Sequence, residues 1–196
     1  VNVIRTRQDW LEEYLVENDI ETCRLMNKIT LQTPIGEAVD ILRNILDLEP
    51  RWAFSLGRTD VAVGLLTERL EQVGVFVAYN GVVGNNTQRI LKVSECRGFA
   101  LVNSVAPYIF VNSADSKSAQ LFTLIHEVAH LMLGVSAGHA GEEIGAHNVN
   151  EKYCDSLAAE FLVPAHVLHE TWNQDIKKQA RQFKVSEIVV ARRAHD

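Results

Sequence analysis

The chain has 196 residues, of which 47% are hydrophobic, and a formal charge of −6 at pH 7. This length suits one globular domain with a sizeable core, and the negative charge disfavours nucleic acid as the main partner. No apolar run reaches the roughly 18 residues of a membrane span, and no signal core opens the chain, so we expect a cytoplasmic protein without a membrane partner. Three scattered cysteines predict no disulfide framework. Because residue 1 is Val1 rather than Met, both a complete chain and a piece of a longer protein stay open.

The first part of the chain has the apolar spacing of helices. A helix is predicted over 7–18, where Trp10 and Tyr14 recur about one turn apart. We interpret these two aromatic residues, together with Trp172, as members of the core. Further helices are predicted over 34–48 and 60–73, each with its apolar residues on one side.

The middle of the chain changes to the apolar pattern of strands. Three short β-rich runs are predicted to be strands: 75–79, 98–102 and 108–112. The last of them can either offer a sheet edge to an extended partner or form ordinary core pairs. The chain returns to helix from Ser116, apart from a glycine-rich stretch, 134–147, that is interpreted as a loop. Helices, then a small sheet, then helices predict an α+β fold.

The stretch FTLIHEVAHLMLG, residues 122–134, is apolar except for one threonine, two histidines and a glutamate. At about 100° per residue, His126, Glu127 and His130 lie on one narrow stripe of a helix. Histidines at i and i+4 can place two imidazole nitrogens on one divalent ion, the HExxH arrangement. Glu127 is offset so that it reaches a water molecule instead of the metal. The alternative, a core helix with two hydrogen-bonded histidines, leaves the glutamate unexplained.

A catalytic zinc ion takes three protein ligands, so a third ligand is needed. The segment NEKYCDSLAAEFLVP, residues 150–164, is interpreted as a helix on which Glu151 and Asp155 share a face, while Glu160 points away. One of the two carboxylates can bind the metal while the other orients a ligand histidine. A solvated surface pair is the alternative. Two glutamates in the glycine-rich loop are fallback ligands, Glu142 and Glu143.

Together these motifs resemble the ImmA/IrrE-type zinc metallopeptidases. The resemblance covers roughly residues 60–193 and rests on five ordered segments: RGFALVN (97–103), YIFVN (108–112), LFTLIHEVAHLMLG (121–134), the block 151–164 and FKVSEIVVARR (183–193). It implies a zincin-like fold, with a small, mostly antiparallel sheet packed on the HExxH helix and further helices beside it. It also implies zinc held by His126, His130 and Glu151, with Glu127 as the catalytic acid and base. Asp155 is then left to orient a ligand histidine, and manganese stays open as the metal.

The resemblance further implies a cytoplasmic endopeptidase that cleaves helix-turn-helix transcriptional repressors or antitoxin-like regulators. Such proteins act in stress-response, phage or mobile-element control, and they often carry an N-terminal helix-turn-helix domain that is not evident here. We expect three parts in this chain: an N-terminal helical segment, 1–57, a zinc metallopeptidase domain, 58–170, and a helix-turn-helix-like segment, 171–196.

Metal-assisted hydrolysis needs a proton carrier and a donor for the developing oxyanion. Glu127 is the predicted carrier, from the water to the leaving amine. Three side chains are candidates for the extra donor: His139, His147 and Tyr153. None of them stands out, because Tyr153 falls on the far side of its helix and the two histidines lie in the predicted loop.

Two other classes of function stay open. Residues 179–193 resemble a helix-turn-helix with Ser186 as the cap of the second helix, and 176–194 carry six basic residues and one acidic residue. DNA binding is therefore an alternative, although packing or substrate docking is favoured for this segment. The second alternative is a metal-containing toxin or regulatory module that binds a partner without proteolysis. The intact Glu127 argues against it, because a pure binder has no need of that carboxylate.

Overall fold

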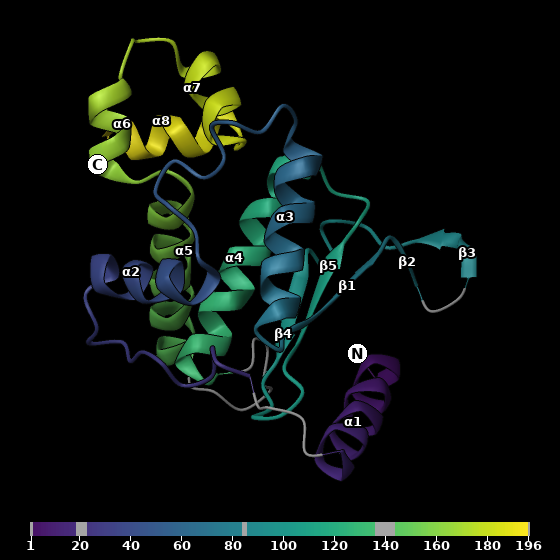
Figure 1. Ribbon diagram of the computed structural model, residues 1–196. Helices are drawn as coiled ribbons and strands as arrows, with labels where there is room; N and C mark the ends of the chain where they lie inside the picture. Colours follow the sequence, from purple (N-terminus) through teal and green to yellow (C-terminus); the bar gives the residue numbers. More distant parts are fainter. Residues whose placement is uncertain (1, 19–22, 84–85, 136–143, 196) are drawn as a thin grey trace.

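The computed structural model describes residues 2–18, 23–83, 86–135 and 144–195. It has the predicted α+β architecture, a small sheet surrounded by helices (Figure 1). The described helices are α1 (Asn2–Glu17), α2 (Ile35–Leu46), α3 (Thr59–Gln72), α4 (Lys117–Leu133), α5 (Ile144–Leu162), α6 (Ala165–Thr171), α7 (Ile176–Phe183) and α8 (Glu187–His195). The described strands are β1 (Phe76–Asn80), β2 (Val82–Val83), β3 (Asn86–Ile90), β4 (Gly98–Leu101) and β5 (Tyr108–Asn112). None of the described helices combines the length and apolar character that a membrane span requires.

The main sheet is mixed and has the strand order β1-β5-β4. β1 runs parallel to β5, whereas β4 runs antiparallel to it. A separate antiparallel hairpin of β2 and β3 projects from the body of the molecule (Figure 1). The sheet that packs on α4 therefore has one parallel and one antiparallel pair, so it is mixed rather than mostly antiparallel as predicted.

β5 is the central strand of the sheet, and all five of its residues are buried. A strand that is apolar on both faces is typical of such a covered, central position. Because β1 and β4 pair with its two sides, β5 has no open edge, and the suggestion that 108–112 offers one to a partner is wrong. The two edge strands of this sheet are β1 and β4, and β4, which begins at Gly98, is the one next to the predicted site. In the turn between β4 and β5, the side-chain oxygen of Asn103 accepts hydrogen bonds from the backbone N–H groups of Val105 and Ala106.

The helix that carries HExxH, α4, lies at the centre of the fold. It packs against β4 and β5, against α5 and against α3, so most of its circumference is buried. Its start is capped by Ser116, whose hydroxyl accepts from the backbone N–H of Ala119. Its end is Gly134, in the left-handed conformation at φ 72°. Both predicted ends are confirmed.

The predicted boundaries hold for most elements, with three exceptions. α1 begins at Asn2, five residues before the predicted start at residue 7. The hairpin of β2 and β3 was not predicted, because its strands are short and lack a regular alternation of apolar and polar residues. α5 begins at Ile144, so the last part of the predicted loop 134–147 is helical. Glycine has a low helix propensity, so the glycines of this stretch led to the prediction of a loop where the helix begins. Residues 136–143 lie outside the described residues.

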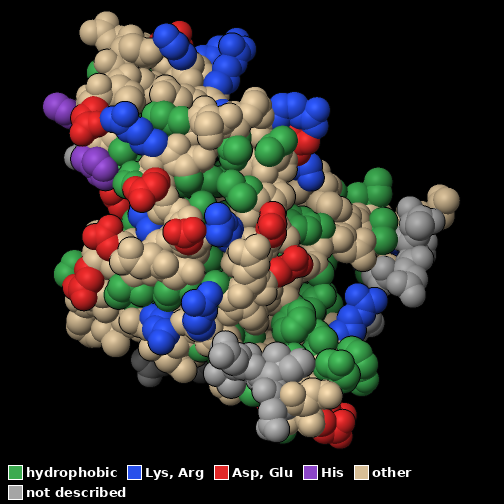
Figure 2. All heavy atoms as spheres, in the orientation of Figure 1, with side chains coloured by type: hydrophobic (Ala, Val, Ile, Leu, Met, Phe, Trp, Pro, Cys, Tyr) green, Lys and Arg blue, Asp and Glu red, His purple; other side chains and the backbone are tan. Residues whose placement is uncertain are grey.

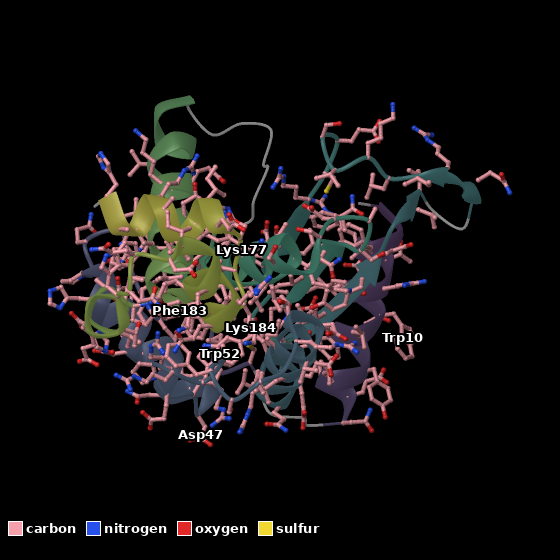
Figure 3. All side chains as sticks on the ribbon, turned by 90° about the horizontal axis from the view of Figure 1, so that it is seen from above. Trp10, Asp47, Trp52, Lys177, Phe183 and Lys184 are labelled. Atoms are coloured by element: carbon pink, nitrogen blue, oxygen red, sulfur yellow. The ribbon has the colours of Figure 1, made fainter. Side chains whose placement is uncertain are left out.

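α1 packs on the end of the sheet through Gln8. Its Nε2 donates to the carbonyl oxygens of Leu101 at 3.0 Å and Ala106 at 2.8 Å. Trp10 and Tyr14 lie on the opposite side of α1 and are 62% and 48% exposed. Figure 3 shows Trp10 at the periphery of the molecule. The prediction that these aromatic residues belong to the core is wrong, because the other face of the helix docks. It is also wrong for Trp172, which is 40% exposed.

α2 packs on α5, where Arg43 Nη2 donates to the carbonyl oxygen of Phe161 at 2.7 Å. The rings of Phe54 and Phe183 meet edge to face, with 5.0 Å between their centroids. Trp52 and Phe183 both lie within the main body (Figure 3). A single core cluster contains side chains from all three predicted parts of the chain. The division at 57/58 and 170/171 stays a prediction.

α7 and α8 form the predicted helix-turn-helix-like pair. α7 ends at Lys184, whose left-handed conformation, with φ 63°, starts the turn into α8. Val190 of α8 is buried, whereas Ile188 is 59% exposed. Lys and Arg side chains gather at the top of the molecule, over α7 (Figure 2).

Candidate metal centre

Three side chains converge where α4 and α5 pack together. His126 and His130 lie one turn apart on α4, with 3.2 Å between their Nε2 atoms. Glu151, in the first half of α5, places Oε2 3.1 Å from His126 Nε2 and Oε1 3.2 Å from His130 Nε2. Among the described residues, these three form the one group that could hold a metal ion.

The donor atoms fit a tetrahedral divalent ion. Atoms about 2.0–2.1 Å from a tetrahedral zinc ion lie roughly 3.3 Å from one another. The observed separations between facing atoms are 3.1–3.2 Å. Lone pairs that face one another at this distance repel unless a cation or a proton lies between them. The side chains present therefore suit a metal ion, and three protein ligands leave a fourth position for water.

Asp155 lies one turn beyond Glu151 on α5 and accepts a hydrogen bond from His126 Nδ1 at 2.9 Å. This bond assigns the proton of the neutral imidazole to Nδ1 and turns the Nε2 lone pair toward Glu151. Burial lowers the pKa of His126, but the bond to Asp155 and the charges of Glu127, Asp155 and Glu151 outweigh burial, so the pKa is raised. In the metal-free protein, the same carboxylates thus stabilise the positively charged form of His126, which carries a second proton.

Replacing Asp155 by alanine is expected to weaken metal binding about 10- to 100-fold, because His126 loses the acceptor that orients its ring. Competition with a chromophoric chelator at constant pH measures the affinity. Glu187→Ala, at an exposed position on α8, removes the same charge and should leave the affinity unchanged. Equal affinities in Asp155→Ala and the unmodified protein would show that this hydrogen bond does not orient the ligand.

Glu127 turns from α4 toward the edge strand β4. It is 4% exposed, and its carboxylate is hydrogen-bonded to the backbone of Ala100, while Oε2 has no hydrogen-bond partner in the described part of the chain. Burial raises the pKa of Glu127 to about 7, with a further increase from Glu151 and an opposing effect of His126. A carboxylate with this pKa can take up and return a proton near neutral pH.

Gly98 allows β4 to approach α4 closely beside this carboxylate. A Cβ atom at position 98 would lie 2.7 Å from the carbonyl oxygen of Phe110 and 2.5 Å from Cγ2 of Thr123. It would also lie 3.6 Å from Cγ of Glu127. A larger residue would therefore force the strand away from the helix that carries the site.

The raised pKa of Glu127 predicts a pH-dependent stability in the metal-free protein. The folded carboxyl group, with a pKa of about 7 against a model value of 4.5, binds its proton more tightly than the unfolded one. Its contribution to the free energy of unfolding is therefore present below about pH 4.5 and is lost as the pH rises through about 7. Glu127→Gln removes this titration, so its stability relative to the unmodified protein should increase by ~3 kcal/mol between pH 4 and pH 8.

Urea unfolding in the presence of a chelator, at both pH values, measures this difference. Titrating groups that do not interact with Glu127 cancel in the comparison of the two proteins. A stability difference that is the same at pH 4 and pH 8 would contradict the raised pKa.

The structure separates the candidates for an additional oxyanion donor. The hydroxyl of Tyr153 donates to the carbonyl oxygen of Thr33 at 2.8 Å, so this side chain is not a donor to the site. His139 lies outside the described residues, and the side chain of His147 does as well. The fallback ligands also lie outside the described residues: Glu142 and Glu143.

A cleft of about 570 Å³ opens over the converging side chains. Its floor comes from α4 and α5, and one wall comes from Arg97 and Gly98. The other wall belongs to the segment of α8: Ser186, Ile188, Val189, Arg192 and Arg193. Sequence reasoning missed this wall, because no local pattern brings α8 next to α4. The excess of basic residues over 176–194 was the signal available in the sequence. It was interpreted as packing or substrate docking, but the sequence did not indicate where on the fold this segment lies.

The fold and the site define a metallopeptidase: a helix with HExxH lies beside an edge strand of a small sheet, and a carboxylate from a second helix faces its histidines. A model of the peptidase M78 family, described as the IrrE N-terminal-like domain, matches residues 70–195. The chain belongs to this family, which confirms the resemblance inferred from the motifs. Among curated proteins, none matches the chain.

Proposed function

We propose that this protein is a zinc-dependent endopeptidase that acts on a protein substrate. The observation that carries the proposal is the set of facing donor atoms of His126, His130 and Glu151, with separations of 3.1–3.2 Å, beside a buried carboxylate. Membership of a metallopeptidase family supports the same chemistry. The proposed setting is the cytoplasm, where the three free cysteines stay reduced.

A zinc ion held by His126, His130 and Glu151 would polarise a water molecule and the scissile carbonyl group. Glu127 takes the proton of the attacking water and passes it to the leaving amine. The Ala100 backbone, close by because position 98 is glycine, holds the Glu127 carboxylate in place. Asp155 keeps the ring of His126 in the orientation of a ligand.

The proposed substrate is a segment of a helix-turn-helix transcriptional repressor or an antitoxin-like regulator. Such a segment can lie in an extended form along β4, because this edge strand borders the cleft at Gly98. The cleft reaches from the ligand residues to α8, so a bound polypeptide segment can contact both.

Metal analysis followed by a cleavage assay tests this proposal. The purified chain is expected to hold about one equivalent of zinc. The zinc-loaded protein should cleave a co-encoded helix-turn-helix repressor, an excess of chelator should stop the cleavage, and added zinc should restore it. A metal-loaded chain that leaves both this repressor and unfolded protein substrates intact would contradict the proposal.

The two alternative functions have less support. For DNA binding, α8 would have to enter the major groove, but its residues from Ile188 to Arg193 border the cleft. A partner-binding module without proteolysis does not explain Glu127, whose burial next to Glu151 destabilises the metal-free fold at neutral pH.

A further inference from the structure

The wall that α8 contributes to the cleft combines apolar and basic side chains. Ile188 is 59% exposed, which is unusual for a large aliphatic residue beside a cleft, and Val189 next to it is half-buried. Arg192 follows one turn later on the same helix and borders the same cleft. A molecule that extends along the cleft past the metal-binding residues therefore meets an apolar surface followed by a positive charge.

The charges that line the cleft are not balanced. Its three carboxylates all belong to the candidate metal centre: Glu151 faces the two histidines, Asp155 accepts from His126, and Glu127 is buried beside the backbone of Ala100. Arg193 is engaged as well, through Glu160 and the carbonyl oxygen of Val163.

Two lining cations remain available. Arg192 is exposed and forms no ion pair with any described residue. Arg97, on the opposite wall, has a side chain that is 66% exposed, and its contact with Asp115 is 3.9 Å long. The exposed charged groups of the cleft that lie outside the candidate metal centre and are not held by a close ion pair are thus positive, in a chain whose formal charge is −6.

We propose that Arg192, with Arg97 across the cleft, selects a substrate segment that carries acidic side chains next to an apolar one, and that Ile188 contacts the apolar side chain. The inference rests on the proposed peptidase function and names the chemical class of its substrate. A guanidinium group can hold a carboxylate with two parallel hydrogen bonds, which makes arginine suited to this selection. The other face of α8 is committed to the core through Val190, so its exposed residues are available to a ligand.

Peptide binding to the zinc-loaded Glu127→Gln protein tests the inference without any need for turnover. The probes are short fluorescent peptides with a central leucine flanked by glutamates, and the same peptides with lysines in place of the glutamates. Fluorescence anisotropy should show tighter binding of the glutamate peptides. Adding Arg192→Glu should weaken that binding at least about tenfold and improve binding of the lysine peptides, because a charged hydrogen bond is replaced by repulsion.

Arg181→Glu is the matched control, because Arg181 is an exposed arginine on α7 outside the cleft lining and its replacement changes the net charge equally. Arg97→Glu provides an independent variant and should shift the preference in the same direction as Arg192→Glu. The inference is overturned if Arg192→Glu and Arg181→Glu weaken binding equally, or if the two peptide sets bind alike. It is also overturned if duplex DNA displaces the peptides and Arg192→Glu abolishes DNA binding, since α8 would then serve nucleic acid.

Hydrolysis of the same peptides by the unmodified, zinc-loaded protein separates the two proposals. Selective binding of glutamate peptides without hydrolysis contradicts the peptidase function and leaves the role of Arg192 intact. Hydrolysis of both peptide sets at equal rates supports the peptidase function and overturns the role of Arg192.

Discussion

Replacing Glu127 by glutamine is expected to lower kcat for peptide hydrolysis by at least about 10²- to 10⁴-fold, with the metal retained. Glutamine has nearly the same shape, and its amide oxygen can still accept a hydrogen bond from the backbone of Ala100. It cannot take a proton from water, so the proton transfer in the bond-breaking step is lost. Steady-state kinetics on a cleaved repressor, with metal analysis of the same samples, measures both properties.

Glu127→Asp is the informative companion to this variant. It keeps a carboxylate but shortens its reach, and we expect activity between those of the unmodified protein and Glu127→Gln. If Glu127→Gln cleaves at an unchanged rate, Glu127 is not the proton carrier. If it loses the metal, the loss of activity says nothing about proton transfer, and the metal content reveals this directly.

Glu151→Ala is expected to weaken zinc binding by more than about 100-fold. The loss of a ligand should weaken binding more than the loss of a residue that only orients a ligand. Zinc held between α4 and α5 stabilises the folded state over the unfolded one. Zinc at about 100 times its dissociation constant adds roughly 2.7 kcal/mol to the free energy of unfolding. Added zinc should therefore raise the Tm of the unmodified protein and have little effect on Glu151→Ala.

Glu160→Ala, on the same helix, is the control for this experiment. Glu160 pairs with Arg193 and accepts a hydrogen bond from the backbone N–H of Ala165, so its loss should lower the Tm. It lies away from the converging histidines, and the zinc-dependent increase in Tm should persist. A zinc response that is lost in Glu160→Ala and kept in Glu151→Ala would exclude Glu151 as the third ligand.

The parts of the fold that could be predicted are those encoded by local patterns. The helical period places His126, Glu127 and His130 on one stripe, and the same period places Glu151 and Asp155 on one face. Helix ends follow local chemistry too, as at Ser116, where a hydroxyl caps the first turn. In the structure these predicted side chains lie together, and their roles as ligands and proton carrier stay predictions.

The parts that could not be predicted depend on contacts between distant segments. The parallel pairing of β1 with β5 depends on how the chain crosses over, which no strand pattern specifies. A helical period tells which residues share a face but not which face docks, so Trp10 and Tyr14 were assigned to the wrong side. The α8 wall of the cleft was missed for the same reason, because its neighbours on α4 lie more than 60 positions earlier in the chain.

The contacts of Arg193 have a consequence for the spacing of residues across the cleft. This side chain joins α8 to the end of α5 through Glu160 and the carbonyl oxygen of Val163. α5 also carries Glu151, so these contacts tie the helix with the proposed selecting residues to the helix with one proposed ligand. We therefore expect that loss of the Arg193 side chain alters the spacing between Arg192 and Glu151, and with it the position of a bound segment relative to the metal centre.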